Sequence, residues 1–189
     1  MSGTGVFFLF IFLILVLGAT SILLLVFYNI LVKREEEANE AWAQVETMYQ
    51  RKLDLVPSLL EAVETAADHE KGTLEGVTGM RAKAQTALEE AKWKDGTIEK
   101  VEDIIGALDH QVGKVRALAE KYPDLKVNSN FLSIQAQLED TENKVAEARR
   151  NYNSWVKHYN ASLKLFPYNL LAGLFRFHSK TYFKIEPVS

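Results

Sequence analysis

The stretch VFFLFIFLILVLGATSILLLVF, residues 6–27, decides the fold class, because only Thr20 and Ser21 within it are polar. At a rise of about 1.5 Å per residue, a helix of this length spans roughly 33 Å, enough to cross a hydrocarbon core of about 30 Å. A cleaved signal peptide would need a basic region before a shorter apolar run, and no Lys or Arg precedes this one. Residues 1–32 are therefore predicted to be an uncleaved transmembrane anchor.

The basic residues beside the apolar stretch predict how the chain crosses the membrane. Lys33, Arg34, Arg51 and Lys52 lie within about 20 residues of its C-terminal end, whereas the N-terminal flank carries only the chain amine. Lys and Arg are enriched in the cytoplasmic flanks of membrane helices. We therefore expect the N-terminus outside and the rest of the chain in the cytoplasm.

The composition of the remaining chain excludes several classes of protein. All 22 Lys+Arg and all 25 Asp+Glu follow residue 32, and the net charge of −3 gives no support to nucleic-acid binding. The absence of Cys excludes disulfides, cysteine-based zinc sites and thiol nucleophiles. With only 4 Pro and 10 Gly in 189 residues, the composition favours long helices.

The first helix after the anchor is marked by a heptad seam that runs through residues 38–66. Its steps alternate between four and three residues, and Lys52 is the one charged residue among apolar ones. Pro57 either kinks this helix or begins a new one capped by Asp54, and the unbroken phase of the seam favours a kink. We expect the helix to stop at Gly72. The seam holds Ala38, Trp42, Val45, Tyr49, Lys52, Val56, Leu59, Val63 and Ala66.

Three further helices are expected after this one. Apolar residues at steps of three and four predict helices over 73–93, from 98 to a stop at Tyr122-Pro123-Asp124, and over about 131–166. Thr97 is expected to cap the second of these, and the loop Asn128-Ser129 to supply the cap of the third. The predicted fold is thus all-α, with an N-terminal transmembrane helix followed by an elongated antiparallel four-helix, coiled-coil-like bundle.

The predicted organisation has three parts: the anchor (1–32), the bundle (33–166) and an aromatic and basic C-terminal tail (167–189). Residues 144–189 carry 8 Lys+Arg against 2 Asp+Glu, whereas residues 33–143 carry 14 against 23. Aromatic residues interleaved with basic ones suit a membrane interface, and the alternative is a tail folded back on the bundle. The candidates for the interface are Phe166, Tyr168, Phe175, Arg176, Phe177, Lys180, Tyr182, Phe183 and Lys184.

The expected topology also predicts contacts between the first and last helices of the bundle. If the first leaves the membrane near Lys33 and the last returns near Phe166, residues at one level have numbers that add to about 200. This register predicts an aromatic cluster of Trp42 with Trp155 or Tyr159, and an ion pair of Asp54 with Arg149 or Arg150. Asp54 is also expected to accept backbone donors freed by Pro57. The alternative is that Asp54 and both arginines are solvated.

A set of short motifs, taken together, resembles the LemA family over residues 28 to about 186. None of the motifs is specific alone, but they occur in the family's order. Lys52 stands where a second arginine is usual, and Ser58 where asparagine is usual. The motifs are YNILV (28–32), AW (41–42), QRKLDLVP (50–57), HE (69–70), RAKA (81–84), YPDL (122–125), FL (131–132), TEN (141–143), ARRNYN (148–153), YN (159–160) and FPYNLLAGLF (166–175).

The resemblance implies a single-pass protein of a prokaryotic cell (inner) membrane with a helical-bundle domain. It implies no agreed enzymatic activity. Members of the family are linked to membrane organisation, including magnetosome membranes in some bacteria.

The residues themselves give no sign of catalysis. The four histidines, His69, His110, His158 and His178, do not lie at metal-ligand spacings, and no phosphate-binding loop or nucleophile constellation is present. We therefore expect no enzyme and no catalytic, cofactor-binding or metal residue. No small-molecule substrate is expected either.

The expected function is that of a membrane-anchored scaffold. Such a protein would self-associate and organise or shape the membrane, with lipid and further copies of itself as partners. The alternative is an adaptor or sensor subunit for a membrane protein such as a membrane-bound protease. The anchor has no GxxxG pattern, so self-association is expected to come from the bundle.

Overall fold

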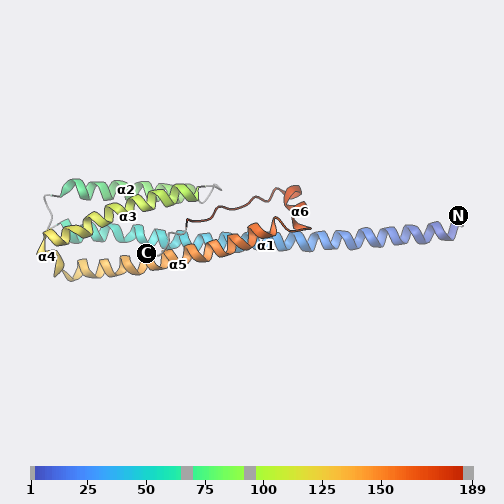
Figure 1. Ribbon diagram of the computed structural model, residues 1–189, viewed down its shortest axis with the longest axis horizontal. Coiled ribbons are helices and arrows are strands. Elements are labelled where there is room, and N and C mark those ends of the chain that lie inside the picture. Colours follow the sequence, from blue (N-terminus) through green and yellow to red (C-terminus); the bar gives the residue numbers. More distant parts are fainter. Residues whose placement is uncertain (1–2, 65–69, 92–96, 185–189) are drawn as a thin grey trace. The chain divides into compact units, whose positions relative to one another are not determined.

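The computed structural model describes residues 3–64, 70–91 and 97–184, which are helical apart from short connections and the segment after α6 (Figure 1). No strand occurs in these ranges, so the predicted all-α class is confirmed. The predicted seam position Ala66 and the expected end of the second helix at Trp93 lie outside the described residues. The helices are α1 (Gly3–Glu64), α2 (Lys71–Ala91), α3 (Ile98–Lys121), α4 (Pro123–Lys126), α5 (Ser129–Ser162) and α6 (Tyr168–Phe175).

The chain forms two compact units. The first consists of Met1–Asn39 and Trp155–Ser179, and the second of Glu40–Ser154 and Lys180–Ser189. The predicted anchor and the first part of the predicted tail therefore belong to one unit. Helices α1 and α5 each contribute to both units.

In the first unit, residues 7–26 of the apolar stretch at the start of α1 are exposed. Within the described residues, α1 is the one helix with a segment long and apolar enough to cross a membrane, and none of that segment is buried. Burial begins where the apolar stretch ends, because Leu31 and Ala38 of α1 and Val156 and Tyr159 of α5 are inaccessible to solvent.

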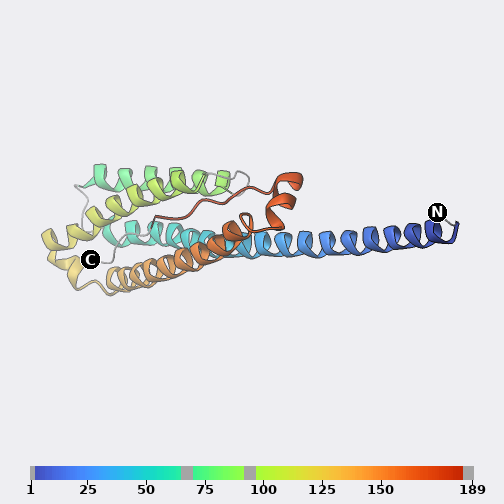
Figure 2. The same cartoon turned by 45° about the vertical axis from the view of Figure 1, so that its right-hand side comes forward.

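In the second unit, the core follows the predicted heptad seam. Val45, Val56, Leu59 and Val63 are completely buried, which confirms the seam on the α1 side. Helices α2 and α3 lie side by side and antiparallel (Figure 2), and Lys100 of α3 pairs with Glu90 of α2 at 2.5 Å. Each of these helices turns an apolar face inward, including Val77, Ala84 and Leu88 of α2 and Val101, Leu108 and Val115 of α3.

Two predicted helix ends need correction. Helix α2 already begins at Lys71, so Gly72 lies in its first turn and does not terminate α1. Helix α5 ends at Ser162, four residues before the predicted end at Phe166. Pro167 disfavours the helical conformation for the residue before it, Phe166, so the helix does not extend to its predicted last residue.

Pro57 lies inside a continuous α1, as the unbroken seam predicted. A proline has no N–H, so the carbonyl of Leu53, four residues earlier, lacks its helical donor. Arg81 of α2 supplies the replacement, because its Nε donates to the Leu53 carbonyl at 2.8 Å. The expectation that Asp54 accepts donors freed by the proline is wrong, because the missing N–H of Pro57 leaves a carbonyl acceptor, and not a donor, without a partner. The Asp54 side chain instead accepts a hydrogen bond of 2.9 Å from Gln50.

The expected cap of the last long helix is confirmed. The side-chain oxygen of Asn128 accepts hydrogen bonds from the backbone N–H groups of Asn130 at 3.0 Å and Phe131 at 3.1 Å. These are two of the donors that the first turn of a helix leaves without an intrahelical partner. The connection from α3 contains the short helix α4, which begins with Pro123 at a position where the missing N–H costs nothing.

Candidate functional site

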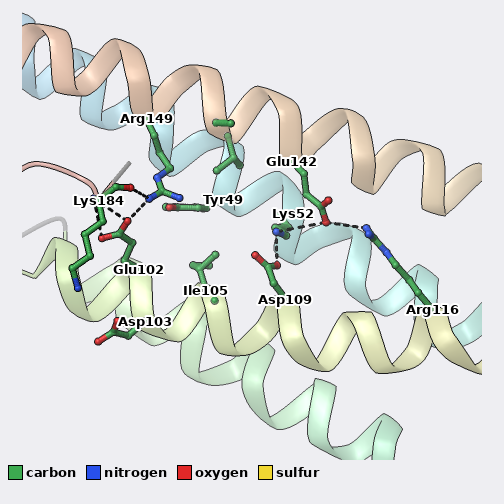
Figure 3. A pocket seen from close by; sticks show the side chains of 13 residues that line it. Tyr49, Lys52, Glu102, Asp103, Ile105, Asp109, Arg116, Glu142, Arg149 and Lys184 are labelled. Atoms are coloured by element: carbon green, nitrogen blue, oxygen red, sulfur yellow. Dashed lines mark hydrogen bonds and ion pairs between the residues drawn. The ribbon is translucent and has the colours of Figure 1, made fainter. Parts of the chain in front are cut away.

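An open groove in the second unit is lined mainly by charged side chains from α1, α3 and α5 (Figure 3). Its volume is about 590 Å³. Basic residues lie beside acidic ones in two groups along it, and the tail reaches its edge through Lys184. The lining residues are Tyr49, Lys52, Glu102, Asp103, Ile105, Gly106, Asp109, Arg116, Glu142, Val145, Ala146, Arg149 and Lys184.

Lys52, the charged residue of the heptad seam, lies at the centre of one ion-pair network. Its side chain is 3% exposed, and its ammonium group pairs with Asp109 of α3 and lies 3.8 Å from Glu142 of α5. The same oxygen of Glu142 accepts a hydrogen bond of 2.9 Å from Arg116 of α3. A buried lysine must be paired to be tolerated, and here carboxylates from two other helices pair with it.

A second network joins α3, α5 and the tail at the other end of the groove. Arg149 pairs with Glu102 and donates a hydrogen bond of 2.7 Å to the backbone carbonyl of Lys184. Glu102 in turn accepts a hydrogen bond of 3.1 Å from the backbone N–H of Lys184. Strong mutual pairing thus fastens the tail at Lys184 to both helices (Figure 3).

Burial changes the acid–base behaviour of two groups in the groove. The pKa of Asp109 is raised above its ordinary value of 3.8, because burial of the carboxyl outweighs the opposing effect of the Lys52 charge. The pKa of the Tyr49 phenol is also raised, again chiefly by burial. Tyr49 therefore stays neutral, and the ion pairs in the groove are formed by its Lys, Arg, Asp and Glu side chains.

Phe183 of the tail forms the centre of an aromatic cluster in the second unit. Its ring stacks on Trp42 at 5.8 Å and meets Tyr152 edge-on at 5.3 Å. The guanidinium of Arg149 lies over the same ring at 5.0 Å. The backbone N–H and carbonyl of Phe183 both pair with the Asn153 side chain, each at 2.9 Å. This part of the tail therefore folds back on the helices.

The register between α1 and α5 differs from the predicted one. Within the second unit, Trp42 contacts Tyr152 and Gln44 accepts a hydrogen bond from Asn151, so paired residue numbers add to about 195. The prediction of about 200 assumed that the last helix continues to Phe166. Its true end four residues earlier, at Ser162, accounts for the difference.

This shift gives the predicted site residues other partners. Arg149 pairs with Glu102 in place of Asp54, and Arg150 is exposed. Trp42 contacts Tyr152 and Phe183. The other two members of the predicted aromatic cluster belong to the first unit: Trp155 meets the His158 ring at 6.4 Å, and Tyr159 is buried.

A second aromatic cluster lies in the first unit, where α6 contacts α1. Tyr168 meets Phe27 edge-on at 5.2 Å, and Phe175 and Phe177 contact Tyr28 at 4.8 and 5.9 Å. The remaining interface candidates are mostly exposed: this holds for Phe166, Arg176, Tyr182 and Lys184, while Lys180 is partly buried.

The prediction missed the acidic partners of the groove, namely Glu102, Asp109 and Glu142. One signal was present, because a single lysine in an otherwise apolar seam requires a carboxylate partner. The sequence does not say which helix supplies that carboxylate. Arg81 belongs to a motif that was noticed, but its hydrogen bond to Leu53 depends on how α2 packs against α1.

These features define a class of protein: an all-helical, membrane-associated protein with a groove whose charged residues pair with each other. The sequence profile of the LemA family matches residues 41–189, and the chain belongs to that family. It is similar to the magnetosome proteins MamQ 2 and MamQ 1 of Paramagnetospirillum magneticum, each 26% identical over 87% of this chain and 67% of the relative. Magnetosome protein MamQ of Magnetospirillum gryphiswaldense is 24% identical over the same shares.

Proposed function

We propose that this protein is a membrane-anchored structural protein that self-associates and organises or shapes the membrane that holds it. The observation that carries the proposal is the continuity of α1, which runs without a break from the exposed apolar stretch into the core of the second unit. The magnetosome names of its relatives also support a role at a membrane.

The groove supports a structural role over a catalytic one. Its charged residues pair with each other across three elements, and paired charges of this kind hold helices together. Among the described residues, no three His, Asp or Glu side chains gather as they would around a metal ion. A reaction centre would instead need a polar group aimed at a substrate.

Self-association is tested by measuring mass in detergent. The full chain, purified in a mild detergent, should be a single homo-oligomer by sedimentation and light scattering. The matched variant that lacks residues 1–32 should remain an oligomer, although a weaker one, because the anchor has no close-packing motif. A strictly monomeric protein in both forms would contradict the proposal. A monomer that becomes larger only with a membrane-protein partner would favour an adaptor.

The proposed orientation places the body in the cytoplasm of a prokaryotic cell, anchored in the inner membrane. The chain has no Cys, so a single introduced cysteine reports its own location. Lys126→Cys is suitable because Lys126 is exposed at the end of α4. A membrane-impermeant maleimide should label it only after the inner membrane is opened. Labelling in cells with an intact inner membrane would reverse the orientation.

A further inference from the structure

Helix α6 is apolar on both its packed and its exposed face, which a helix surrounded by water would not be. Leu171 and Ala172 form the face packed in the first unit, and Leu171 is 3% exposed. Leu170 and Leu174, one turn apart, form the other face and are 63% and 73% exposed. Phe166, just before the helix, is more exposed still. This second face therefore needs an apolar environment from outside the chain.

The position of α6 shows which environment that is. Helix α6 lies beside α1 (Figures 1 and 2). Its aromatic contacts are with Phe27 and Tyr28, the residues that directly follow the exposed apolar part of α1. An apolar stretch of about 20 residues fills a hydrocarbon core of about 30 Å. The end of that stretch, and α6 with it, then falls at the boundary between lipid tails and headgroups.

The polar residues around α6 match such a boundary. Arg34 of α1 lies 5.6 Å over the Tyr168 ring and donates a hydrogen bond to Ser162. Lys164 and Arg176 are exposed on either side of α6. Tyrosine, lysine and arginine gather at membrane interfaces, where the ring or stem is buried and the polar end reaches the headgroups.

We infer that α6 is a second membrane contact, which lies on the phospholipid interface beside the point where α1 emerges. Leu170, Leu174 and Phe166 enter the boundary of the acyl chains, and Lys164 and Arg176 face anionic headgroups. A bilayer fits better than a second copy of the chain, because α6 packs on Phe27 and Tyr28, at the end of the exposed apolar surface of α1 in the same unit. The inference rests on the proposed membrane anchoring and adds a lipid-binding element to it.

The test uses the full chain, reconstituted in vesicles of phosphatidylcholine and phosphatidylglycerol, with single cysteines that carry an environment-sensitive fluorophore. Leu174→Cys reports on the exposed face of α6. Val127→Cys is the matched control, because Val127 is equally apolar and 79% exposed but lies in the second unit, beyond α4. Leu15→Cys reports on the apolar stretch of α1. Quenching is measured with lipids spin-labelled near the headgroup for the Leu174 and Val127 probes, with lipids spin-labelled deep in the acyl chain for the Leu15 probe, and with aqueous iodide for all three.

The Leu174 probe should be quenched severalfold more by the spin-labelled lipid than the Val127 probe, and less by iodide. Equal iodide quenching at both positions would overturn the inference. So would a Leu174 probe shielded from both quenchers, because protein would then cover this face. The Leu15 probe separates the two proposals: lipid quenching at Leu15 without quenching at Leu174 refutes only the role of α6. Loss of lipid quenching at Leu15 refutes the anchor as well.

Discussion

Replacing Lys52 with Met should destabilise the protein by about 2 kcal/mol. The substitution keeps the buried stem of the side chain but removes its charge, which leaves Asp109 and Glu142 without their shared cation. Breaking a fully buried pair costs about 3–5 kcal/mol. Here the side chains of Asp109 and Glu142 are 42% and 36% exposed, so water screens part of the loss. The expected cost is therefore below this range, at about 2 kcal/mol.

The measurement is urea unfolding of the full chain in detergent micelles, followed by tryptophan fluorescence. Lys144→Met is the matched control, because Lys144 also pairs with a carboxylate, Asp140 at 2.8 Å, but is 44% exposed. Water largely screens an exposed pair one turn apart on a helix, so the loss of this pair should cost much less than the loss of Lys52. The difference between the two variants therefore isolates the effect of burial.

A double variant tests whether the loss arises from the uncompensated carboxylate. Arg116 still pairs with Glu142 in Lys52→Met, so Asp109 is the carboxylate left without a cation. Adding Asp109→Asn removes that charge, so the combined loss should be smaller than the sum of the single losses by about 1 kcal/mol. The reasoning is refuted if Lys52→Met costs no more than the Lys144 control. Strict additivity in the double variant would show that Lys52 and Asp109 are not coupled.

Three further predictions concern stability in the same assay. Arg81→Ala should cost about 1–2 kcal/mol, because it leaves the buried Leu53 carbonyl without a donor. The cost should be smaller in a Pro57→Ala background, because residue 57 then has the N–H that donates to this carbonyl. An equal cost in both backgrounds would refute this. Asn128→Ala should cost about 1 kcal/mol by removing the cap of α5, and an unchanged urea midpoint would contradict it. Because burial raises the pKa of Asp109, its contribution to stability is fully present below 3.8 and is lost as pH rises through the raised value. Asp109→Asn should abolish that loss in a pH series, and an identical pH profile would show that another group causes it.

Local pattern predicted the helices, and non-local packing decided their partners. The seam from Val45 to Val63 and the cap at Asn128 depend on side chains a few residues apart, so period and capping rules were sufficient. The register between α1 and α5 was not predicted correctly, because it depends on where α5 ends. Because α5 ends at Ser162, four residues before the predicted end, Arg149 does not lie at the level of Asp54 and pairs with Glu102.

The partners of Lys52 and of the carbonyl freed by Pro57 were not predicted, for a related reason. Each breaks a local rule, and each is compensated by a residue far away in the sequence: Asp109 of α3 for the lysine and Arg81 of α2 for the proline. Local reasoning detects the defect in the pattern but does not identify the residue that repairs it. A residue that breaks the local pattern, such as Lys52 or Pro57, therefore indicates that a compensating residue should be sought elsewhere in the sequence.

The two departures also bear on how the second unit selects one arrangement of its helices. A seam of Ala, Val and Leu tolerates a slip of one heptad, because such a slip again places apolar residues opposite each other. A slip of α1 would instead carry Lys52 away from Asp109 and Glu142 and leave a buried charge without a partner. It would also separate the Leu53 carbonyl from Arg81. Apolar burial thus supplies most of the stability, whereas the lysine and the proline penalise the slipped registers that apolar packing alone would allow.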